Sequence, residues 1–228
     1  MQFNIHGSYI QNIWCYMLIS KKNNFIFVHI KKTAGTSITK SLSPYDDRSI
    51  YLKILNTRIL TRIKYSRGMN PLPHHAPAYK IKEYIGSEEY EKYFSFAFVR
   101  NPFDWQISNY FFIKQSRLHP RYNEVKKLSF NEYLDWTLTN NRIYSQSEFI
   151  SDKSDKTKII VDYVGKLENI DEDFDHILKE INLDPQMNLK FTNKSKRNKN
   201  YKQYYDEYSI EFIKEHYKTD LDNFSYNF

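Results

Sequence analysis

The stretch Phe27–Lys40 (FVHIKKTAGTSITK) brings two lysines, a glycine and several hydroxyl side chains close together. Lysine supplies positive charge, threonine and serine supply hydroxyl donors, and Gly35 lets a ligand approach the backbone closely. A helix that begins at Thr36 would add unpaired N–H groups and the positive end of its dipole. This combination suits a phosphate or a similar oxyanion.

The loop has two other interpretations. The Walker A motif of P-loop kinases and GTPases needs a lysine directly after its second glycine, whereas both lysines here precede Gly35, so such an enzyme is disfavoured. A strand–turn–helix connection with one capping hydroxyl would look partly similar. The string Lys32–Ser37 contains more donors than a cap needs, because capping takes a single side-chain oxygen.

A second segment, Phe96–Phe112 (FAFVRNPFDWQISNYFF), also combines groups that bind phosphate. Arg100 follows an apolar run, and its planar guanidinium fork suits phosphate. Ser108 lies two helical turns further along the chain. Taken alone, the segment leaves other interpretations open: Arg100 forms an ion pair with Asp104, or Ser108 faces solvent.

Strands and helices alternate along the chain around these segments. Apolar runs predict buried strands at Phe25–Ile30 and Phe94–Val99, and a third strand region over Lys158–Val161 and Tyr163–Leu167. The helices are predicted at Thr36–Leu42, Ala78–Ile85, a start at Ser87 as N-cap, Phe103–Gln115, Ser129–Leu138, Asp171–Ile181 and Tyr208–Tyr217, with Ile50–Tyr65 also favouring helix.

This alternation predicts an α/β fold with a central, mainly parallel β-sheet flanked by helices. Ligands bind such sheets at the carboxyl ends of the strands. The first loop and Arg100 both lie at such ends, which favours one shared ligand. The 228 residues contain no Pro/Gly/Ser-rich linker, so we expect a single domain at residues 24–228, after an N-terminal extension at 1–23.

Composition narrows the partners and the compartment. The net charge of +7 favours an anionic partner, such as a nucleotide, a nucleic acid, an acidic glycan or a membrane surface. The single cysteine, Cys15, cannot form an intramolecular disulfide. The apolar patch Tyr9–Ile19 is too short to span a bilayer and follows no basic region. We therefore expect a soluble, cytoplasmic protein without a transmembrane segment, with peripheral membrane association left open.

Together, the two segments resemble motifs of a known family. HIKKTAGTS resembles the 5′-phosphosulfate loop of carbohydrate sulfotransferases, and FVRNPFDWQIS resembles their 3′-phosphate motif. HAPAYKIKEYIG, SFNEYL, VDYVGKLENIDEDF, NKSKRNKNYKQYY and TDLDNFSYNF follow the family in matching order, so the resemblance covers about Asn24 to Phe228. It implies a P-loop-like sulfotransferase fold. The implied reaction transfers a sulfuryl group from 3′-phosphoadenosine 5′-phosphosulfate (PAPS) to a glycan or glycolipid hydroxyl, leaving 3′,5′-diphosphoadenosine (PAP).

The resemblance also implies a role for each matching residue. Lys32 would contact the sulfuryl group and the leaving phosphate oxygen, whereas Arg100 and Ser108 would hold the 3′-phosphate. The 5′ end would be bound by Lys31, Lys32, Thr33, Ala34, Gly35, Thr36 and Ser37, and the nucleotide would be covered by Lys194, Ser195 and Arg197. The family usually has proline where this chain has Lys31, which leaves open whether Lys31 touches the sulfate.

Sulfuryl transfer to a hydroxyl also needs a base, which typically contributes about 10²–10⁴-fold in rate. The resemblance assigns this role to His75, with the neighbouring His74 as the fallback on the acceptor side. The alternative is that both are ordinary loop or helix-capping residues. Glu168 would position the acceptor or a loop, or would form a structural ion pair with Lys166. His29 is expected to orient the loop backbone.

Two rival functions stay open at this point. The first is another nucleotide-dependent enzyme, such as a kinase. The second is a non-catalytic polyanion-binding protein. The basic run Lys190–Lys202 could bind single-stranded nucleic acid, but no RNA-binding signature accompanies it, so we expect no nucleic-acid partner. No His, Cys or carboxylate cluster has metal-ligand spacing, so we predict no metal.

Overall fold

The computed structural model describes residues 18–46, 72, 75–184, 189, 197–198 and 200–228. Several residues singled out in the sequence lie outside this part of the chain: the helix expected at Ile50–Tyr65, and the candidate site residues His74, Lys194 and Ser195.

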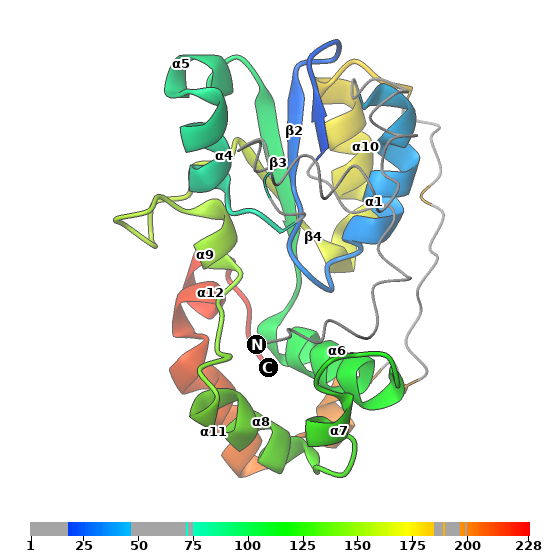
Figure 1. Ribbon diagram of the computed structural model, residues 1–228, viewed down its shortest axis with the longest axis vertical. Helices are drawn as coiled ribbons and strands as arrows, with labels where there is room; N and C mark the ends of the chain where they lie inside the picture. The colour runs from blue at the N-terminus through cyan, green and yellow to red at the C-terminus, as the bar shows by residue number, and fades with distance from the viewer. Residues whose placement is uncertain (1–17, 47–71, 73–74, 185–188, 190–196, 199) are drawn as a thin grey trace, which may run out of the picture.

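Four strands form one sheet in the order β1-β2-β3-β4: β1 Leu18–Ser20, β2 Phe25–Val28, β3 Phe94–Val99 and β4 Tyr163–Lys166. β2, β3 and β4 are parallel, and β1 pairs antiparallel with β2 (Figure 1). The predicted α/β fold with a mainly parallel sheet is therefore confirmed. β1 comes from residues that the sequence assigned to the N-terminal extension, and it forms one edge of the sheet.

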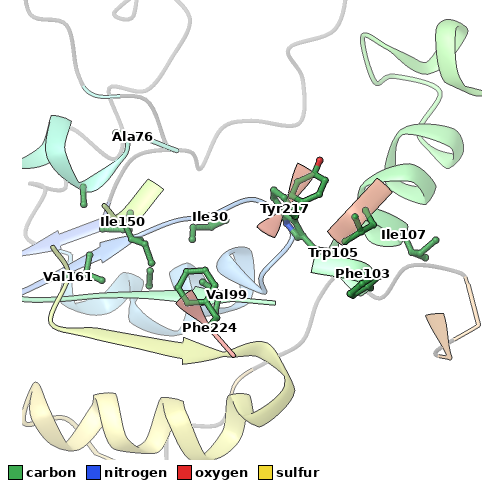
Figure 2. Close-up of a cluster of buried hydrophobic side chains, with 14 of the residues drawn as sticks. Ile30, Ala76, Val99, Phe103, Trp105, Ile107, Ile150, Val161, Tyr217 and Phe224 are labelled. Atoms are coloured by element: carbon green, nitrogen blue, oxygen red, sulfur yellow. The ribbon is translucent and has the colours of Figure 1, made fainter. Parts of the chain in front are cut away.

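Side chains of the two central strands alternate between two cores. Phe25 and Phe27 of β2 lie with Phe96 and Phe98 of β3 in one cluster, under α1 and α10. The intervening residues of both strands join the larger cluster on the opposite face, which Figure 2 shows around Ile30, Val99 and Phe224: Ile26, Val28, Ala97 and Val99. Burial on both faces explains why these strands are continuous apolar runs.

Helices connect the strands and build a second layer beyond the carboxyl ends of the parallel strands (Figure 1). Between β2 and β3 the described helices are α1 Gly35–Leu42, the 3₁₀ turn η1 Ser43–Tyr45, α4 Ala78–Ile85 and α5 Ser87–Tyr90. After β3 come α6 Pro102–Gln115, α7 Tyr122–Val125, α8 Phe130–Thr139 and α9 Ser147–Ile150. After β4 come η2 Leu167–Asn169, α10 Ile170–Glu180, η3 Tyr201–Tyr204, α11 Glu207–His216 and α12 Lys218–Asn223.

Local rules explain the starts of α8 and α6. Ser129 caps α8 in a capping box with Glu132, as its sequence indicates. Pro102 takes the first turn of α6, after Asn101, whose side chain accepts the N–H of Phe103 at 3.0 Å. No described helix is long and apolar enough to cross a membrane.

Two local predictions were wrong. Gly86, with φ of 91°, is the N-cap of α5, and Ser87 is its first helical residue. Lys158–Val161 does not extend β4, because in this segment only Ile159 forms a bridge, and its partner is Ser151 outside the sheet. The residues after α11 form α12 before the aromatic tail begins. That tail packs on the core, with Phe224 6% exposed.

Candidate functional site

The loop between β2 and α1 has an unusual backbone. Lys32 and Ala34 adopt left-handed φ angles of 64° and 63°, which few residues other than glycine do. The indole N–H of Trp105 donates to the carbonyl oxygen of Lys31 at 2.6 Å and anchors the loop to α6. Trp105 in turn packs edge-on against Tyr217 in the larger core cluster (Figure 2). The loop is therefore held in shape by buried side chains outside it.

Gly35 sits directly against the ring of His29. A Cβ atom at position 35 would lie 1.9 Å from both Cδ2 and Nε2 of His29, which is far inside contact distance. His29 is itself 6% exposed, at the end of the run that forms β2. The first residue of α1 therefore has to be glycine so that the helix N-terminus can approach the strand end.

The start of α1 is free of side-chain capping. Its N-cap is Ala34, and no side chain accepts a hydrogen bond there. The interpretation of Thr36 and Ser37 as mere caps is thus wrong. The first described helical bonds run from the N–H groups of Ser37 and Ile38 to Ala34, so the N–H groups of Gly35 and Thr36 precede them. This helix start combines those N–H groups with two hydroxyls.

Thr33 has a different role from its neighbours. Its side chain is fully buried, and its hydroxyl donates to the carbonyl oxygen of Ile30 at 3.0 Å. A hydroxyl has a single proton to donate. In this arrangement the Thr33 hydroxyl closes the turn.

Arg100 lies at the carboxyl end of β3 and reaches across to the first loop. Its Nη1 donates to the carbonyl oxygen of Lys32 at 3.2 Å, although the two residues are 68 positions apart. Its Nε and Nη2 donate to Asp104 Oδ2 at 2.8 and 2.5 Å. The ion pair with Asp104 considered from the sequence is thus present. These contacts use three of the five guanidinium N–H groups.

Arg197 also binds Asp104, through the other carboxylate oxygen. The three side chains are largely buried, at 12% exposed for Arg100, 18% for Asp104 and 6% for Arg197. One carboxylate therefore draws together two arginines from distant parts of the sequence. The pair of guanidinium groups keeps a net positive charge that a bound anion would offset.

The ammonium group of Lys32 lies near Arg100 and Arg197. Its Nζ is 4.2 Å from the centroid of the Phe112 ring, in a cation–π contact. Burial lowers the pKa of Lys32 to about 8, and the positive charges of Arg100 and Arg197 act in the same direction. The lysine is thus a partly desolvated cation beside two further cations.

One face of α6 is turned toward the loop. Trp105 and Phe112 both contact it, and they lie seven residues apart, on the same side of a helix. Ser108 falls between them on that side and is 3% exposed. Its interpretation as a solvent-facing residue is therefore wrong. Phe112 itself was missed in the sequence, where its position four residues after Ser108 was the available signal.

His75 is held against the end of β2. Its Nδ1 lies 2.8 Å from the carbonyl oxygen of His29, and the two imidazole rings meet edge-on with centroids 4.5 Å apart. A carbonyl oxygen only accepts, so Nδ1 carries the proton. In the neutral ring, Nε2 then bears the lone pair and is the atom that can take a proton.

Glu168 fixes the backbone at the end of β3. Its Oε1 accepts the N–H of Asn101 at 2.7 Å, and its Oε2 accepts the hydroxyl of Tyr226 at 2.7 Å. The ammonium of Lys166 instead lies over the Tyr226 ring, 4.8 Å from its centroid. The structure thus links Glu168 to the residue after Arg100 and to the C-terminal tail.

The side chain of Lys31 is exposed. Burial lowers the pKa of His119, and the charges of Lys31 and then Arg121 lower it further. His119 also packs edge-on against Phe112, with ring centroids 5.4 Å apart. No cluster of three or more potential metal ligands occurs among the described residues.

Comparisons with known proteins identify the family of the chain. The profile of the sulfotransferase family matches residues 16–227, which is nearly the whole chain. An uncharacterized protein of Archaeoglobus fulgidus is 30% identical over 116 residues, which cover 50% of this chain and 88% of that protein. No solved structure matches the chain. The chain belongs to the sulfotransferase family.

Proposed function

We propose that this protein transfers the sulfuryl group of PAPS to a hydroxyl of an acceptor, and that the acceptor is a carbohydrate. Membership of the sulfotransferase family supports sulfuryl transfer in general. The donor and the acceptor class rest on the site and on the motifs that resemble carbohydrate sulfotransferases.

The observation that carries the proposal is the contact between two strand ends. Arg100 at the end of β3 donates to the backbone of Lys32 in the loop after β2. The two cations therefore lie side by side while belonging to motifs that resemble opposite ends of one nucleotide site. A ligand with a phosphosulfate at one end and a phosphate at the other fits this pair.

The residues present fit a nucleotide with anionic groups at both ends. The N-terminus of α1 offers uncapped N–H groups and the hydroxyls of Thr36 and Ser37 to the 5′ end. Arg100 keeps two N–H groups beyond the described contacts, and Ser108 lies on the α6 face that borders the loop. When bound, PAPS supplies an activated sulfuryl group. Arg197 adds positive charge on the side of Asp104.

His75 acts as the general base in this proposal. The carbonyl oxygen of His29 fixes the proton on Nδ1, so Nε2 is left to take the proton of the acceptor hydroxyl. As the acceptor oxygen bonds to sulfur, the bond from sulfur to the 5′-phosphate oxygen breaks, and that oxygen keeps the electron pair. Lys32 and the loop N–H groups stabilise the developing charge.

A binding experiment separates this function from the kinase alternative. Isothermal titration calorimetry should detect binding of PAP in the absence of any metal. PAP should bind more tightly than ATP with Mg²⁺. Preference for ATP with Mg²⁺ would favour the kinase.

A transfer experiment tests the chemistry itself. Labelled PAPS is incubated with a panel of glycans, glycolipids and small alcohols, and the label should pass to a carbohydrate hydroxyl. A non-catalytic polyanion-binding protein would instead bind the acidic glycans with steep salt dependence and transfer no label. Transfer to a non-carbohydrate alcohol alone would refute the acceptor class and leave the donor standing.

A further inference from the structure

The side-chain amide of Gln146 clamps the backbone of Arg100 with two hydrogen bonds. Its Oε1 accepts the N–H of Arg100 at 2.8 Å, and its Nε2 donates to the carbonyl oxygen of Arg100 at 2.7 Å. Gln146 is fully buried. Such a pair of bonds is what a neighbouring strand would give a residue in a sheet.

The clamp begins where the sheet ends. The register of β3 with β4 stops at Val99 opposite Lys166, one residue before Arg100. The register with β2 stops earlier, at Ala97. The side-chain amide of Gln146 therefore extends the hydrogen bonding of β3 by one residue and fixes the direction in which Arg100 leaves the strand.

Gln146 is itself held by a buried carboxylate. Asp220 Oδ2 accepts the N–H of Gln146 at 2.7 Å, and Oδ1 accepts the N–H and the hydroxyl of Ser147 at 2.8 and 2.7 Å. Asp220 lies in α12 and is fully buried. Gln146 directly precedes α9, and Ile150 of that helix lies in the core (Figure 2). Truncating Gln146 or Asp220 would leave buried polar groups unpaired.

We propose that Gln146 is a positioning residue that aims Arg100 at the 3′-phosphate, with Asp220 holding Gln146 in place. This inference rests on the proposed function, in which Arg100 binds that phosphate. It assigns to Gln146 the preference of the enzyme for nucleotides that carry a 3′-phosphate over those that lack one.

The test compares PAP with adenosine 5′-monophosphate (AMP), which lacks the 3′-phosphate. Calorimetry on the full chain should show that the wild-type protein binds PAP at least tenfold more tightly than AMP, because charge-assisted bonds to phosphate are strong. Gln146→Met removes both bonds to Arg100 at similar volume. We expect PAP affinity to fall about tenfold, and AMP affinity to change less than about twofold.

Two further variants calibrate this result. Asp220→Asn keeps the side-chain size but replaces one of the two acceptor oxygens that hold Gln146 and Ser147 with a donor, so it should lower PAP affinity in the same selective way and by less. Ser151→Ala is the matched control, because Ser151 is fully buried at the end of α9 and its hydroxyl lies 2.7 Å from the carbonyl oxygen of Ser147 rather than near Arg100. It should leave the ratio of the two affinities unchanged.

The outcomes separate the two proposals. If folded Gln146→Met loses PAP and AMP affinity equally, or if the ratio of PAP affinity to AMP affinity is unchanged, the role of Gln146 is overturned. The proposed function then stays intact. A wild-type protein that binds both nucleotides equally overturns the proposed donor and the inference with it. Melting temperatures are recorded for every variant. If Gln146→Met does not fold, folded Asp220→Asn decides. A lowered ratio of PAP affinity to AMP affinity supports the role of Gln146, and an unchanged ratio refutes it.

Discussion

The ends of β2 and β3 each position a cation of the candidate site, Lys32 and Arg100, and they hold it in different ways. At the end of β3, Arg100 is bound to the carboxylate of Asp104, and Asn101 and Pro102 start a regular helix. At the end of β2, Lys32 has a left-handed backbone, and its ammonium group lies over the Phe112 ring. Among the described contacts no carboxylate pairs with Lys32.

This difference separates a permanent charge from an adjustable one. A guanidinium stays protonated in proteins, and its fork fixes the direction of its bonds. A desolvated ammonium titrates in an accessible range, and the pKa of Lys32 is lowered to about 8. We infer that Arg100 at the β3 end binds the donor nucleotide. Lys32 at the β2 end stabilises the negative charge that develops during transfer. The variants below should separate these roles.

Lys32→Ala should have the largest effect. Removing a donor aimed at the leaving oxygen typically costs about 10²–10³-fold in kcat, and we expect about 10³-fold here. Single-turnover transfer from labelled PAPS measures the chemical step, and calorimetry should show PAP affinity changed by less than about tenfold. Lys40→Ala, an exposed lysine in the last turn of α1, is the matched control and should behave like wild type.

His75→Ala should reduce kcat by about 10²-fold without weakening PAP binding, because its role is toward the acceptor proton. Steady-state kinetics on the identified acceptor measures this, and added imidazole should restore part of the rate. Near wild-type kcat would show that His75 is not the base.

Arg100→Ala should act mainly on binding. We expect PAP affinity to fall about tenfold or more, and kcat at saturating PAPS to change less than about threefold. Arg100→Lys should not restore affinity, because an ammonium lacks the planar fork. A large loss of kcat with unchanged affinity would reverse the two assigned roles.

The pH dependence should show the smaller effects. In the enzyme without bound substrate, Lys32 loses its proton as the pH rises through about 8. The value of kcat/KM should therefore fall about tenfold per pH unit above that pH. Lys32→Arg should remove this fall, since arginine stays protonated. A wild-type profile that stays flat to pH 10 would contradict the role of the lysine charge.

Phe112→Leu sharpens the same measurement. The aromatic face favours the charged lysine, so its removal should lower the pKa of Lys32 and move the fall to lower pH by about 0.5 unit. The direction of this shift distinguishes a cation–π contact from simple burial, because opening the site to water would raise the pKa instead.

The sequence predicted those parts of the molecule that depend on local patterns. Continuous apolar runs indicated β2 and β3, and the rule that parallel strands present ligands at their carboxyl ends brought Lys32 and Arg100 together. The helix start at Ser87 was misassigned because Gly86 takes the capping position with a positive φ of 91°. Serine identity alone does not reveal such backbone geometry.

Contacts between distant residues were not predictable in this way. Arg197 meets Asp104 across 93 positions, and Gln146 meets Arg100 across 46. No spacing rule links these pairs, because each depends on how whole helices pack beside the sheet. The buried site therefore contains more fixed polar groups than its two motifs indicate.

The ring of His29 occupies the space that the first side-chain carbon of any other residue at position 35 would need. Replacing Gly35 alone should force the loop away from the strand, and replacing His29 alone should leave a hole beneath it. A change at one position becomes tolerable only together with a change at the other. Natural variation in this chain should therefore alter the two positions as a pair, so each restrains the evolution of the other.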